Sequence, residues 1–345
     1  MSQCKNKTKE ECKQYLEECL WCEGKTRKYC RRSKAKNSKK TKKTKKLIYS
    51  CKQISKTRCK KHEGEMDKMC KLSKHNRCIY NKYMKLISWN VNGIRSKSMN
   101  IIKDKQFNPD SHLAKLLKNY DPDILCLGET KCQCKNVDDL KKLIPFEYQT
   151  WSCSTEKLGY SGVAIMSKHP YKELGKIPGL ENNTQGRSIC LEFPTFYLVN
   201  VYVPNSGTNE EYRKNEWDTK VFEFLKEYKK KKKPIIYGGD LNVVNEVDDI
   251  YNPEIIKKGK SPGVKEFERA NFKQLLELGY IDTMRSKNKD KKLWTWWDAR
   301  TRARAKDRGW RLDYFLTSKK SIIKDADILK EVYGSDHCPI SLTIK

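Results

Sequence analysis

Residues 234–243 read PIIYGGDLNV, a run of apolar residues that leads through two glycines to Asp240 and Asn242. An apolar run of this length that follows a proline and is bounded by glycine indicates a buried β-strand. The strand would deliver two polar side chains at its carboxyl end. An Asp-x-Asn pair is by itself typical of a turn or a helix cap. Whether it has a functional role depends on which residues the other strands place beside it.

Buried strands and helices continue over residues 84–345. Helical spacing of apolar residues is found at residues 112–120, 210–230 and 265–278. Because strands occur both before and between the helices, the sequence predicts an α/β fold: two mixed sheets packed on each other and flanked by helices, a four-layer α/β sandwich. Apolar runs indicate further strands at residues 85–91, 123–129, 162–168, 188–193, 196–203, 310–318 and 339–344.

Polar residues lie in or beside six of these strands, and most of them are carboxylates or amides. Burying so many polar groups without a ligand would be costly. Oxygen ligands suit a hard divalent cation, and a histidine held by an aspartate can act on a phosphate. The set therefore suits metal-assisted hydrolysis of a phosphodiester, in which a carboxylate activates water and donors stabilise the developing charge. The residues are Asn90, Asn92, Glu129, Tyr202, Asn205, Asp240, Asn242, Asp313, Asp336 and His337.

Residues 1–83 differ in composition from the rest of the chain. The 345 residues carry a net charge of +31, of which residues 1–83 hold +19 and residues 84–345 hold +12. This excess predicts a polyanionic partner, nucleic acid or an anionic surface, although a solubilising tail would look the same. No apolar run is long enough to span a bilayer, and the first residues lack a signal-peptide core. We therefore expect no membrane partner and an intracellular protein, with the nucleus and a virus particle as candidate places.

Nine of the 15 cysteines fall in residues 1–83, and eight of them form a repeat. Each of two units contains two Cys-x7-Cys pairs that are nine or ten residues apart, and a lysine-rich linker joins the units. Units this small need disulfide or metal cross-links to fold, because they cannot bury enough apolar surface. We favour two disulfides per unit, with zinc as the alternative, since zinc sites usually have tighter spacing. The eight residues are Cys4, Cys12, Cys22, Cys30, Cys51, Cys59, Cys70 and Cys78.

Six stretches follow in order along residues 84–345: ISWNVNGIR from Ile87, CLGETKC from Cys126, VYVPNSG from Val201, YGGDLNVV from Tyr237, WRLDYFL from Trp310 and GSDHCPI from Gly334. Together they resemble the motifs of the exonuclease III-type apurinic/apyrimidinic (AP) endonucleases, within the wider endonuclease/exonuclease/phosphatase superfamily. The ETK, GDLN and SDH elements occur across that superfamily, whereas VYVPN, WTWWDAR and GWRLDYF are typical of the abasic-site endonucleases.

The resemblance implies a base-excision DNA repair enzyme that hydrolyses the phosphodiester 5′ to an abasic site in duplex DNA. It also implies a 3′-5′ exonuclease or 3′-phosphodiesterase activity and a monomer. Two alternatives are another phosphodiesterase or phosphatase of the same superfamily and a basic nucleic-acid packaging protein. The chain then divides into a Cys-rich unit at residues 1–32, a linker at 33–50, a second Cys-rich unit at 51–83 and an AP endonuclease catalytic domain at 84–345.

The resemblance also implies a metal site, with Mg²⁺ as the expected ion and Mn²⁺ as the alternative. Glu129, with Asn92 and Asp336, would hold the ion. Some relatives have Asp where Asn92 stands, so one metal position is expected to be looser. The full candidate metal set is Asn92, Glu129, Asp240, Asn242, Asp336 and His337.

Catalytic roles are implied in the same way. Asp240 would activate or orient the attacking water, with Asn242 as its partner in the transition state. Asp313 and His337 would polarise the scissile phosphate. Because neighbouring residues on a strand point to opposite faces, Asp313 rather than Asp336 is expected to orient the His337 ring. Tyr202 matches the active-site tyrosine of the family.

Contacts to DNA are implied for a further group of residues. Trp296, Trp310 and Leu312 would line a pocket for a flipped sugar without a base, although Trp296 could also be a plain core aromatic. Arg302 and Arg304 suit phosphate contacts, and a solvated charged loop is the competing interpretation. The remaining candidate contacts are Asn90, Lys131 and Asn205.

Overall fold

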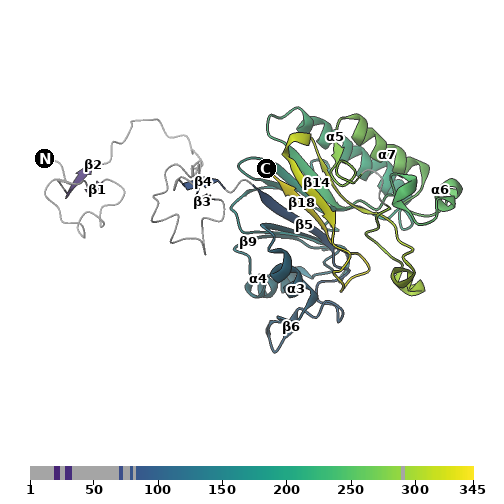
Figure 1. Ribbon diagram of the computed structural model, residues 1–345, viewed down its shortest axis with the longest axis horizontal. Coiled ribbons are helices and arrows are strands. Elements are labelled where there is room, and N and C mark those ends of the chain that lie inside the picture. The colour runs from purple at the N-terminus through teal and green to yellow at the C-terminus, as the bar shows by residue number, and fades with distance from the viewer. Residues whose placement is uncertain (1–18, 24–27, 33–69, 73–77, 81–82, 289–291) are drawn as a thin grey trace. The chain divides into compact units, whose positions relative to one another are not determined.

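The computed structural model describes residues 19–23, 28–32, 70–72, 78–80, 83–288 and 292–345. The chain divides into two compact units, Met1–Tyr49 and Ser50–Lys345, and each is described by itself. The second unit contains the two large sheets and all the α-helices labelled in Figure 1.

Four short strands are described in the N-terminal part of the chain. β1 (Cys19–Glu23) pairs antiparallel with β2 (Lys28–Arg32), and β3 (Cys70–Leu72) pairs antiparallel with β4 (Cys78–Tyr80). The second cysteine pair of each predicted unit therefore lies on a hairpin, with one cysteine on each strand. Cys4, Cys12, Cys51 and Cys59 lie outside the described residues, and disulfides or zinc stay a prediction for all eight cysteines, Cys4, Cys12, Cys22, Cys30, Cys51, Cys59, Cys70 and Cys78.

Two six-stranded mixed sheets form the centre of the second unit (Figure 1). The first contains β5 (Met84–Asn90), β8 (Ile124–Gly128), β9 (Tyr148–Ser152), β10 (Val163–Ser167), β17 (Ile323–Ile328) and β18 (Ile340–Ile344), in the order β17-β18-β5-β8-β10-β9. The second contains β11 (Lys172–Gly175), β12 (Ser188–Glu192), β13 (Tyr197–Tyr202), β14 (Ile235–Asp240), β15 (Ile281–Asp282) and β16 (Asp313–Thr317), in the order β11-β12-β13-β14-β16-β15. A separate hairpin is formed by β6 (Ile102–Lys103) and β7 (Gln106–Phe107).

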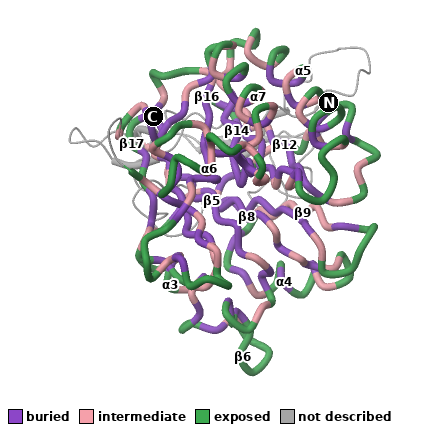
Figure 2. Tube along the Cα trace, turned by 90° about the vertical axis from the view of Figure 1, so that its right-hand side faces the viewer, coloured by how far each residue is buried: buried purple, intermediate pink, exposed green. Residues whose placement is uncertain are grey.

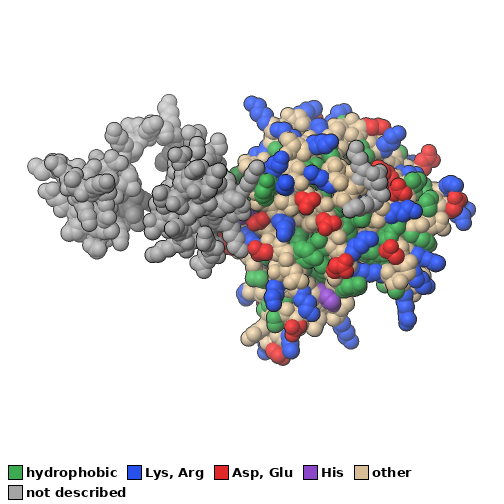
Figure 3. Space-filling view, in the orientation of Figure 1, with side chains coloured by type: hydrophobic (Ala, Val, Ile, Leu, Met, Phe, Trp, Pro, Cys, Tyr) green, Lys and Arg blue, Asp and Glu red, His purple; other side chains and the backbone are tan. Residues whose placement is uncertain are grey.

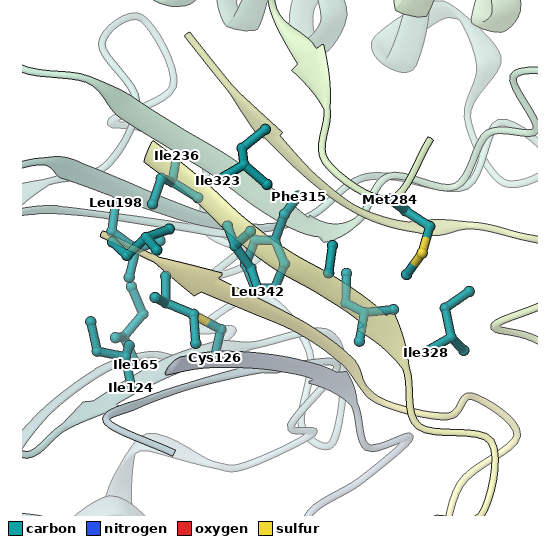
Figure 4. Packing of buried hydrophobic residues seen from close by; sticks show 14 of the residues in the cluster. Ile124, Cys126, Ile165, Leu198, Ile236, Met284, Phe315, Ile323, Ile328 and Leu342 are labelled. Atoms are coloured by element: carbon teal, nitrogen blue, oxygen red, sulfur yellow. The ribbon is translucent and has the colours of Figure 1, made fainter. Parts of the chain in front are cut away.

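The main hydrophobic core lies between the two sheets. Ile124 and Ile165 from the first sheet pack with Leu198, Ile236 and Phe315 from the second, and all five are buried (Figure 4). Successive strand residues alternate between faces, so each sheet has a second apolar face that must be covered from outside.

Helices cover those outer faces. α3 (His112–Tyr120) and α4 (Val137–Leu143) pack on the first sheet, and α5 (Asp218–Lys229) and α7 (Glu266–Glu277) pack on the second. Figure 2 shows the buried strands enclosed by partly exposed helices and loops, so the predicted four-layer α/β sandwich is confirmed.

In the described ranges no helix has the length and apolar character needed to cross a membrane. Shorter elements are α6 (Glu254–Lys258) and 3₁₀ turns at Cys134–Asn136, Val247–Asp249, Ala299–Thr301, Ala303–Lys306 and Lys320–Ile322.

The predicted helix at residues 210–230 is two elements rather than one. A π-helical turn, Tyr212–Trp217, precedes α5. Arg213 is buried within this turn, where its Nη1 donates to the carbonyl of Pro204 and its Nε to Asp218 Oδ1, both at 2.8 Å. The wider π-helical turn makes room for a buried guanidinium that a regular α-helix would place differently.

The predicted strand at residues 310–318 begins only at Asp313. Before that point the backbone of Arg311 donates to the carbonyl of Asp249 at 2.8 Å, away from the sheet. Trp310 forms isolated bridges with Ile250 and Trp296 instead. The segment that enters β16 is therefore held beside the sheet, where it can form the wall of a site.

Candidate active site

The predicted site residues gather where strands of both sheets end. β13 and β14 run parallel, and the pairing places Tyr202 beside Asp240. β14 and β16 run antiparallel, and the pairing places Asp240 beside Asp313. In the first sheet β5 and β8 run parallel, so Asn90 pairs with Gly128 and lies next to Glu129. The two sheets thus bring these ends together although the residues are far apart in the sequence.

Asn90 joins the two sheets at this point. It is buried, and its Nδ2 donates to Asp240 Oδ2 at 2.9 Å and to Glu129 Oε2 at 3.2 Å. Its Oδ1 accepts from the backbone nitrogen of Asn92 at 3.0 Å. One amide therefore fixes two carboxylates from different sheets relative to each other.

His337 lies between two aspartates of the second sheet. Its Nδ1 is 2.8 Å from Asp313 Oδ2, and its Nε2 is 3.8 Å from Asp240 Oδ2. Burial opposes the charge on His337, but Asp313 and, after it, Asp240 and Asp336 outweigh burial and raise the pKa of the ring to about 10. The ring is therefore an imidazolium at neutral pH, with Nε2–H able to donate to an anion.

Asp240 is buried and held by backbone and side-chain donors. Its Oδ1 accepts from the backbone nitrogen of Asn242 at 2.9 Å, and its Oδ2 accepts from Asn90. Burial raises the pKa of Asp240 to about 7, against the opposing charge of His337 and with a smaller rise from Asp313. A carboxylate whose pKa lies near neutrality can take up a proton from water.

Asn242 and Asn205 stand next to Asp240. Asn242 Nδ2 donates to the carbonyl of Val203 at 2.9 Å, and Asn242 Oδ1 accepts from Asn205 Nδ2 at 3.4 Å. The side-chain amide of Asn242 is thereby oriented by β13 and by the turn that follows it.

Asn92, Glu129 and Asp336 form an oxygen-rich group, and the ammonium group of Lys131 contacts two of them. Lys131 Nζ lies 2.5 Å from Asn92 Oδ1 and 3.1 Å from Glu129 Oε1, and Asn92 Nδ2 donates to Asp336 Oδ1 at 2.9 Å. Oxygens of Asn92 and Glu129 already contact a cation, and Asp336 is hydrogen-bonded to Asn92, so the residues fit a hard ion such as Mg²⁺ or Mn²⁺. The group combines carboxylates with an amide; among the described residues no cluster of three or more His, Cys, Asp or Glu side chains is arranged to hold a metal.

Several of these residues have an unusual backbone conformation. Asn92, Glu129, Lys131 and Asn242 have φ angles of 45°, 48°, 50° and 49°, in the left-handed region that non-glycine residues rarely adopt. The conformation is held by neighbouring chain; the backbone nitrogen of Lys131, for example, donates to the carbonyl of Ser161 at 2.7 Å. Such conformations cluster at functional sites, where the surrounding structure imposes them.

Tyr202 lies against a buried arginine that sequence reasoning missed. The Arg187 guanidinium is 4.8 Å from the ring centroid of Tyr202 and 5.3 Å from that of Tyr160. Burial, with Glu129 and Asp240 next in weight, raises the pKa of Tyr202 well above its ordinary value, so the phenol keeps its proton as a donor. A single arginine ahead of a strand forms no pattern, so the sequence offered no signal for Arg187.

Trp296, Trp310 and Leu312 form an apolar wall beside Asp336. The two indole rings meet edge to face with centroids 5.6 Å apart, and Trp296 Nε1 donates to Asp336 Oδ2 at 3.2 Å. Leu312 is buried, whereas both tryptophans remain half-buried. Trp297, the neighbour of Trp296, is buried on the other side of the chain. Trp296 is therefore only partly a core residue, and its indole reaches the site.

The two predicted phosphate-binding arginines have different surroundings. Arg302 is exposed. Arg304 is packed between the rings of Trp297 and Tyr333, 4.7 and 4.1 Å from their centroids, and its Nη2 donates to the carbonyl of Val332 at 2.8 Å. Arg302 can face solvent or DNA, whereas Arg304 is held against the protein.

A buried ion network supports the apolar wall, and it was also missed from sequence. Arg311, between Trp310 and Leu312, donates from Nε and Nη2 to Asp249 at 2.7 and 2.9 Å, and its Nη2 lies 2.7 Å from Asp282 Oδ2. The only signal was a charged residue inside an apolar run, which more often marks an exposed position.

Comparisons with known proteins agree with this geometry. Residues 87–337 match the model of the endonuclease/exonuclease/phosphatase family. An exodeoxyribonuclease of Bacillus subtilis is 38% identical over 268 residues, which cover 76% of this chain and 99% of that protein. The DNA repair nuclease APEX1 of Danio rerio is 38% identical over 267 residues, which cover 75% of this chain and 81% of that protein.

Solved structures show the same architecture. A 3′-5′ exonuclease from Neisseria meningitidis superposes with a TM-score of 0.62 at 25% identity, over 75% of this chain and 98% of that one. An AP endonuclease from Leishmania major superposes with a TM-score of 0.65 at 23% identity, over 76% and 88% of the respective chains, a likeness of fold.

Proposed function

The chain belongs to the endonuclease/exonuclease/phosphatase family, and we propose that it is a DNA repair nuclease that hydrolyses the phosphodiester 5′ to an abasic site in duplex DNA. The observation that carries the proposal is the group of Asp240, Asp313 and His337 at adjoining strand ends, beside the oxygen-rich group of Asn92, Glu129 and Asp336. The relatives named above, an exodeoxyribonuclease and a DNA repair nuclease, support DNA as the substrate class.

Asp240 would orient the attacking water and accept its proton. Asn90 and the backbone of Asn242 hold its carboxylate in place, so water bound to it has a fixed direction toward the phosphorus. The raised pKa of Asp240, about 7, allows the carboxylate to take up a proton as the water attacks.

His337 and Tyr202 would stabilise charge that develops on the phosphate oxygens. Asp313 holds Nδ1 of the imidazolium, which leaves Nε2–H directed to the space shared with Asp240. The Tyr202 phenol keeps its proton and can donate from the neighbouring strand. Donors held in place before the reaction need no reorganisation during it.

Asn92, Glu129 and Asp336 are the residues that would hold Mg²⁺, with Mn²⁺ as the alternative. When bound, the ion would supply neutralising charge to the phosphate and to the leaving oxygen. The ammonium group of Lys131 contacts the side-chain oxygens of Asn92 and Glu129. When those oxygens bind the metal, the ammonium group would contact the DNA backbone instead.

Trp296, Trp310 and Leu312 would receive the abasic sugar. Extrusion from the helix costs least where no base is stacked or paired, and a small apolar wall leaves little room for a base. Arg302 would contact backbone phosphates. Activity at damaged or unpaired 3′ ends would use the same residues, and because all of them come from one chain, we propose that the monomer is active.

Duplex oligonucleotides that contain a tetrahydrofuran abasic analogue test the proposal. The enzyme should cut only the damaged strand, immediately 5′ to the lesion, leave a 3′-hydroxyl, and require Mg²⁺ or Mn²⁺. An undamaged duplex and a phosphoinositide are the matched controls. Hydrolysis of the phosphoinositide with no cut in the abasic duplex would contradict the proposal.

A further inference from the structure

A cleft of about 760 Å³ adjoins the candidate active site. Asn92 and Asp336, which belong to the candidate active site, line the cleft together with Arg302 and Tyr333. The volume lies in the range of small-molecule sites and is sufficient for a nucleotide. Asn92, Asp336 and Arg302 already have proposed roles, whereas Tyr333 has none.

Asp336 borders both the cleft and the apolar wall of Trp296, Trp310 and Leu312. Trp296 packs on Trp310 and donates to Asp336, whereas the next residue, Trp297, lines the cleft. Consecutive residues of an extended segment point to opposite sides, so the two spaces are separated by this segment. If the abasic sugar lies against Trp310, as proposed, the cleft would face the other side of the scissile phosphate. That side carries the nucleotide whose 3′ oxygen is the leaving group.

Tyr333 forms a fixed aromatic surface in the cleft. Its ring is among the large exposed apolar side chains, with 55% of the residue accessible. The Arg304 guanidinium lies 4.1 Å from its centroid, and the carbonyls of Val332 and Lys330 hold that guanidinium by hydrogen bonds of 2.8 and 2.5 Å. The same guanidinium lies 4.7 Å from the ring centroid of buried Trp297. Arg304, held by two carbonyls, thus links the exposed Tyr333 ring to buried Trp297.

The chain behind Tyr333 is tightly placed as well. Gly334 has a φ of +114°, and a Cβ at that position would come within 2.9 Å of the His112 side chain. Only glycine fits there without displacing His112, so the backbone that carries Tyr333 runs directly against α3. The tyrosine is therefore preorganised rather than free to swing away.

An exposed, rigid aromatic ring beside cationic side chains is the usual platform for an unpaired nucleobase. Arg302 supplies an exposed positive charge in the same cleft for the accompanying phosphate. A base held in the duplex by pairing and stacking would have to be extruded to reach Tyr333, and extrusion costs least when the base is mismatched.

We propose that the cleft binds the nucleobase immediately 5′ to the scissile phosphate when that base is unpaired, by stacking on Tyr333. The inference rests on the proposed function. Its consequence is a preference for abasic sites whose 5′ neighbour is mismatched, a form of clustered damage.

Incision of two abasic duplexes tests the inference. They differ only in whether the nucleotide 5′ to the tetrahydrofuran is paired or mismatched. Wild type should cut the mismatched duplex at least about fivefold more efficiently in kcat/KM, the lower end of what one stacked base contributes. Tyr333→Ala should lose this preference and cut the paired duplex within about twofold of wild type, and Tyr333→Phe, the matched control, should keep the preference.

Fluorescence provides a second measurement that does not depend on incision. With 2-aminopurine as the mismatched neighbour and with EDTA to prevent cutting, binding of wild type or Tyr333→Phe should quench the fluorescence by stacking, and Tyr333→Ala should not. Equal quenching by Tyr333→Ala, or a preference that survives in Tyr333→Ala, would overturn the inference. If wild type cuts neither duplex, the proposed function fails while the fluorescence still decides the inference. If wild type cuts both duplexes equally well and no quenching is seen, only the inference fails.

Discussion

Asn90 illustrates how a buried residue can act on the site through other residues. Its amide donates to Asp240 and to Glu129, which belong to different sheets and to different proposed tasks. Asp313 acts similarly, since its carboxylate holds Nδ1 of His337 and raises the pKa of the ring. At the scale of the residue, the site therefore consists of groups that would contact the phosphate and groups that position them.

Asparagine substitutions at Asp313 and Asp336 separate two of these tasks. Asp313→Asn keeps the side-chain shape but removes the charge that stabilises the His337 imidazolium, so kcat at saturating Mg²⁺ should fall by about 100-fold or more. Asp336→Asn should raise the Mg²⁺ concentration needed for half-maximal incision by about tenfold or more. Incision rates measured across a Mg²⁺ titration give both quantities.

Asp104→Asn, an exposed carboxylate in the β6–β7 hairpin, is the control and should behave as wild type. A higher Mg²⁺ requirement in Asp313→Asn together with an unchanged one in Asp336→Asn would contradict the assignment of Asp336 to the metal and of Asp313 to His337.

Sequence motifs identified the polar residues at strand ends but not the residues that support them. Asp240 and His337 stand out because polar groups interrupt apolar runs. Arg187 carries no comparable signal, and its position between Tyr160 and Tyr202 depends on how β12 and β13 pair. The contact between Asn90 and Asp240 depends in turn on how the two sheets pack, which the sequence pattern alone does not specify.

At the scale of the element, the loop after β8 connects metal-site residues to the edge of the first sheet. Glu129 and Lys131 lie at its start, and Cys134 lies three residues beyond Lys131. A disulfide joins Cys134 to Cys153 after β9, with Cα atoms 5.6 Å apart. The loop that contains Glu129 is therefore closed at both ends, by β8 and by a covalent bond to the chain after β9.

Removal of this disulfide should destabilise the fold. In the chain-entropy account, a bridge between residues 19 positions apart contributes about 3 kcal/mol. Urea unfolding of the Cys134→Ser/Cys153→Ser double variant under oxidising conditions should show a free energy of unfolding lower by about that amount. The control is Cys190→Ser, at a buried cysteine without a disulfide; an unfolding midpoint of the double variant equal to that of wild type would show that the bridge does not form.

The ion network of Arg311, Asp249 and Asp282 should be a second determinant of stability. Arg311→Met would remove the ion-pair partner of buried Asp282 and leave Asp249 with Arg285 alone, at a cost of about 3 kcal/mol. The control is Arg300→Met, since the Arg300 side chain is 93% exposed and should matter little. Thermal unfolding at neutral pH measures the difference, and equal melting temperatures would contradict the structural role of Arg311.

The same network predicts a loss of stability in acid. Burial opposes ionisation of Asp249, but Arg311 and Arg285 outweigh burial and hold the pKa of Asp249 below its ordinary value. A depressed pKa adds stability above the pKa of the unfolded chain, about 4, and that stability is lost as the pH falls through the lower folded value. Wild type should therefore lose more stability than Arg311→Met between about pH 5 and pH 2; parallel pH curves would contradict this assignment.

Elements were predictable from sequence where they are buried on both faces. β5, β8, β10 and β14 are continuous apolar runs, and α3 was predicted with its observed bounds. Edge strands were missed because they carry polar residues: β11 reads KELG and is mostly exposed, and β17 reads IKDADI. Charged edges protect a sheet from pairing with other chains, and they remove the apolar pattern by which a strand is recognised.

At the scale of the whole molecule, positive charge is divided unequally. Residues 1–83 hold +19 of the net +31, and the match to the family model begins only after them, at residue 87. On the visible face of the catalytic unit in Figure 3, Lys and Arg side chains are distributed over the surface and not gathered in one patch. The N-terminal part is therefore the concentrated source of charge for binding a polyanion.

Deletion of residues 1–83 should make DNA binding less sensitive to salt. If the eight lysines at residues 33–46 neutralise phosphates, the slope of log K against log salt should become shallower by about seven. A full-length variant with Lys39, Lys40, Lys42 and Lys43 changed to Gln should give an intermediate slope. Identical slopes for the deletion variant and the full-length protein would contradict a role of residues 1–83 in DNA binding.

The central claim is that Asp240 and His337 act on one scissile phosphate. Single-turnover incision of an abasic duplex by Asp240→Asn and by His337→Ala tests it most directly, with binding to the same duplex measured alongside. We expect incision to fall by about 100- to 10,000-fold in each variant while the Kd stays within about tenfold of the wild-type value. Incision by either variant at a rate near that of wild type would contradict the claim.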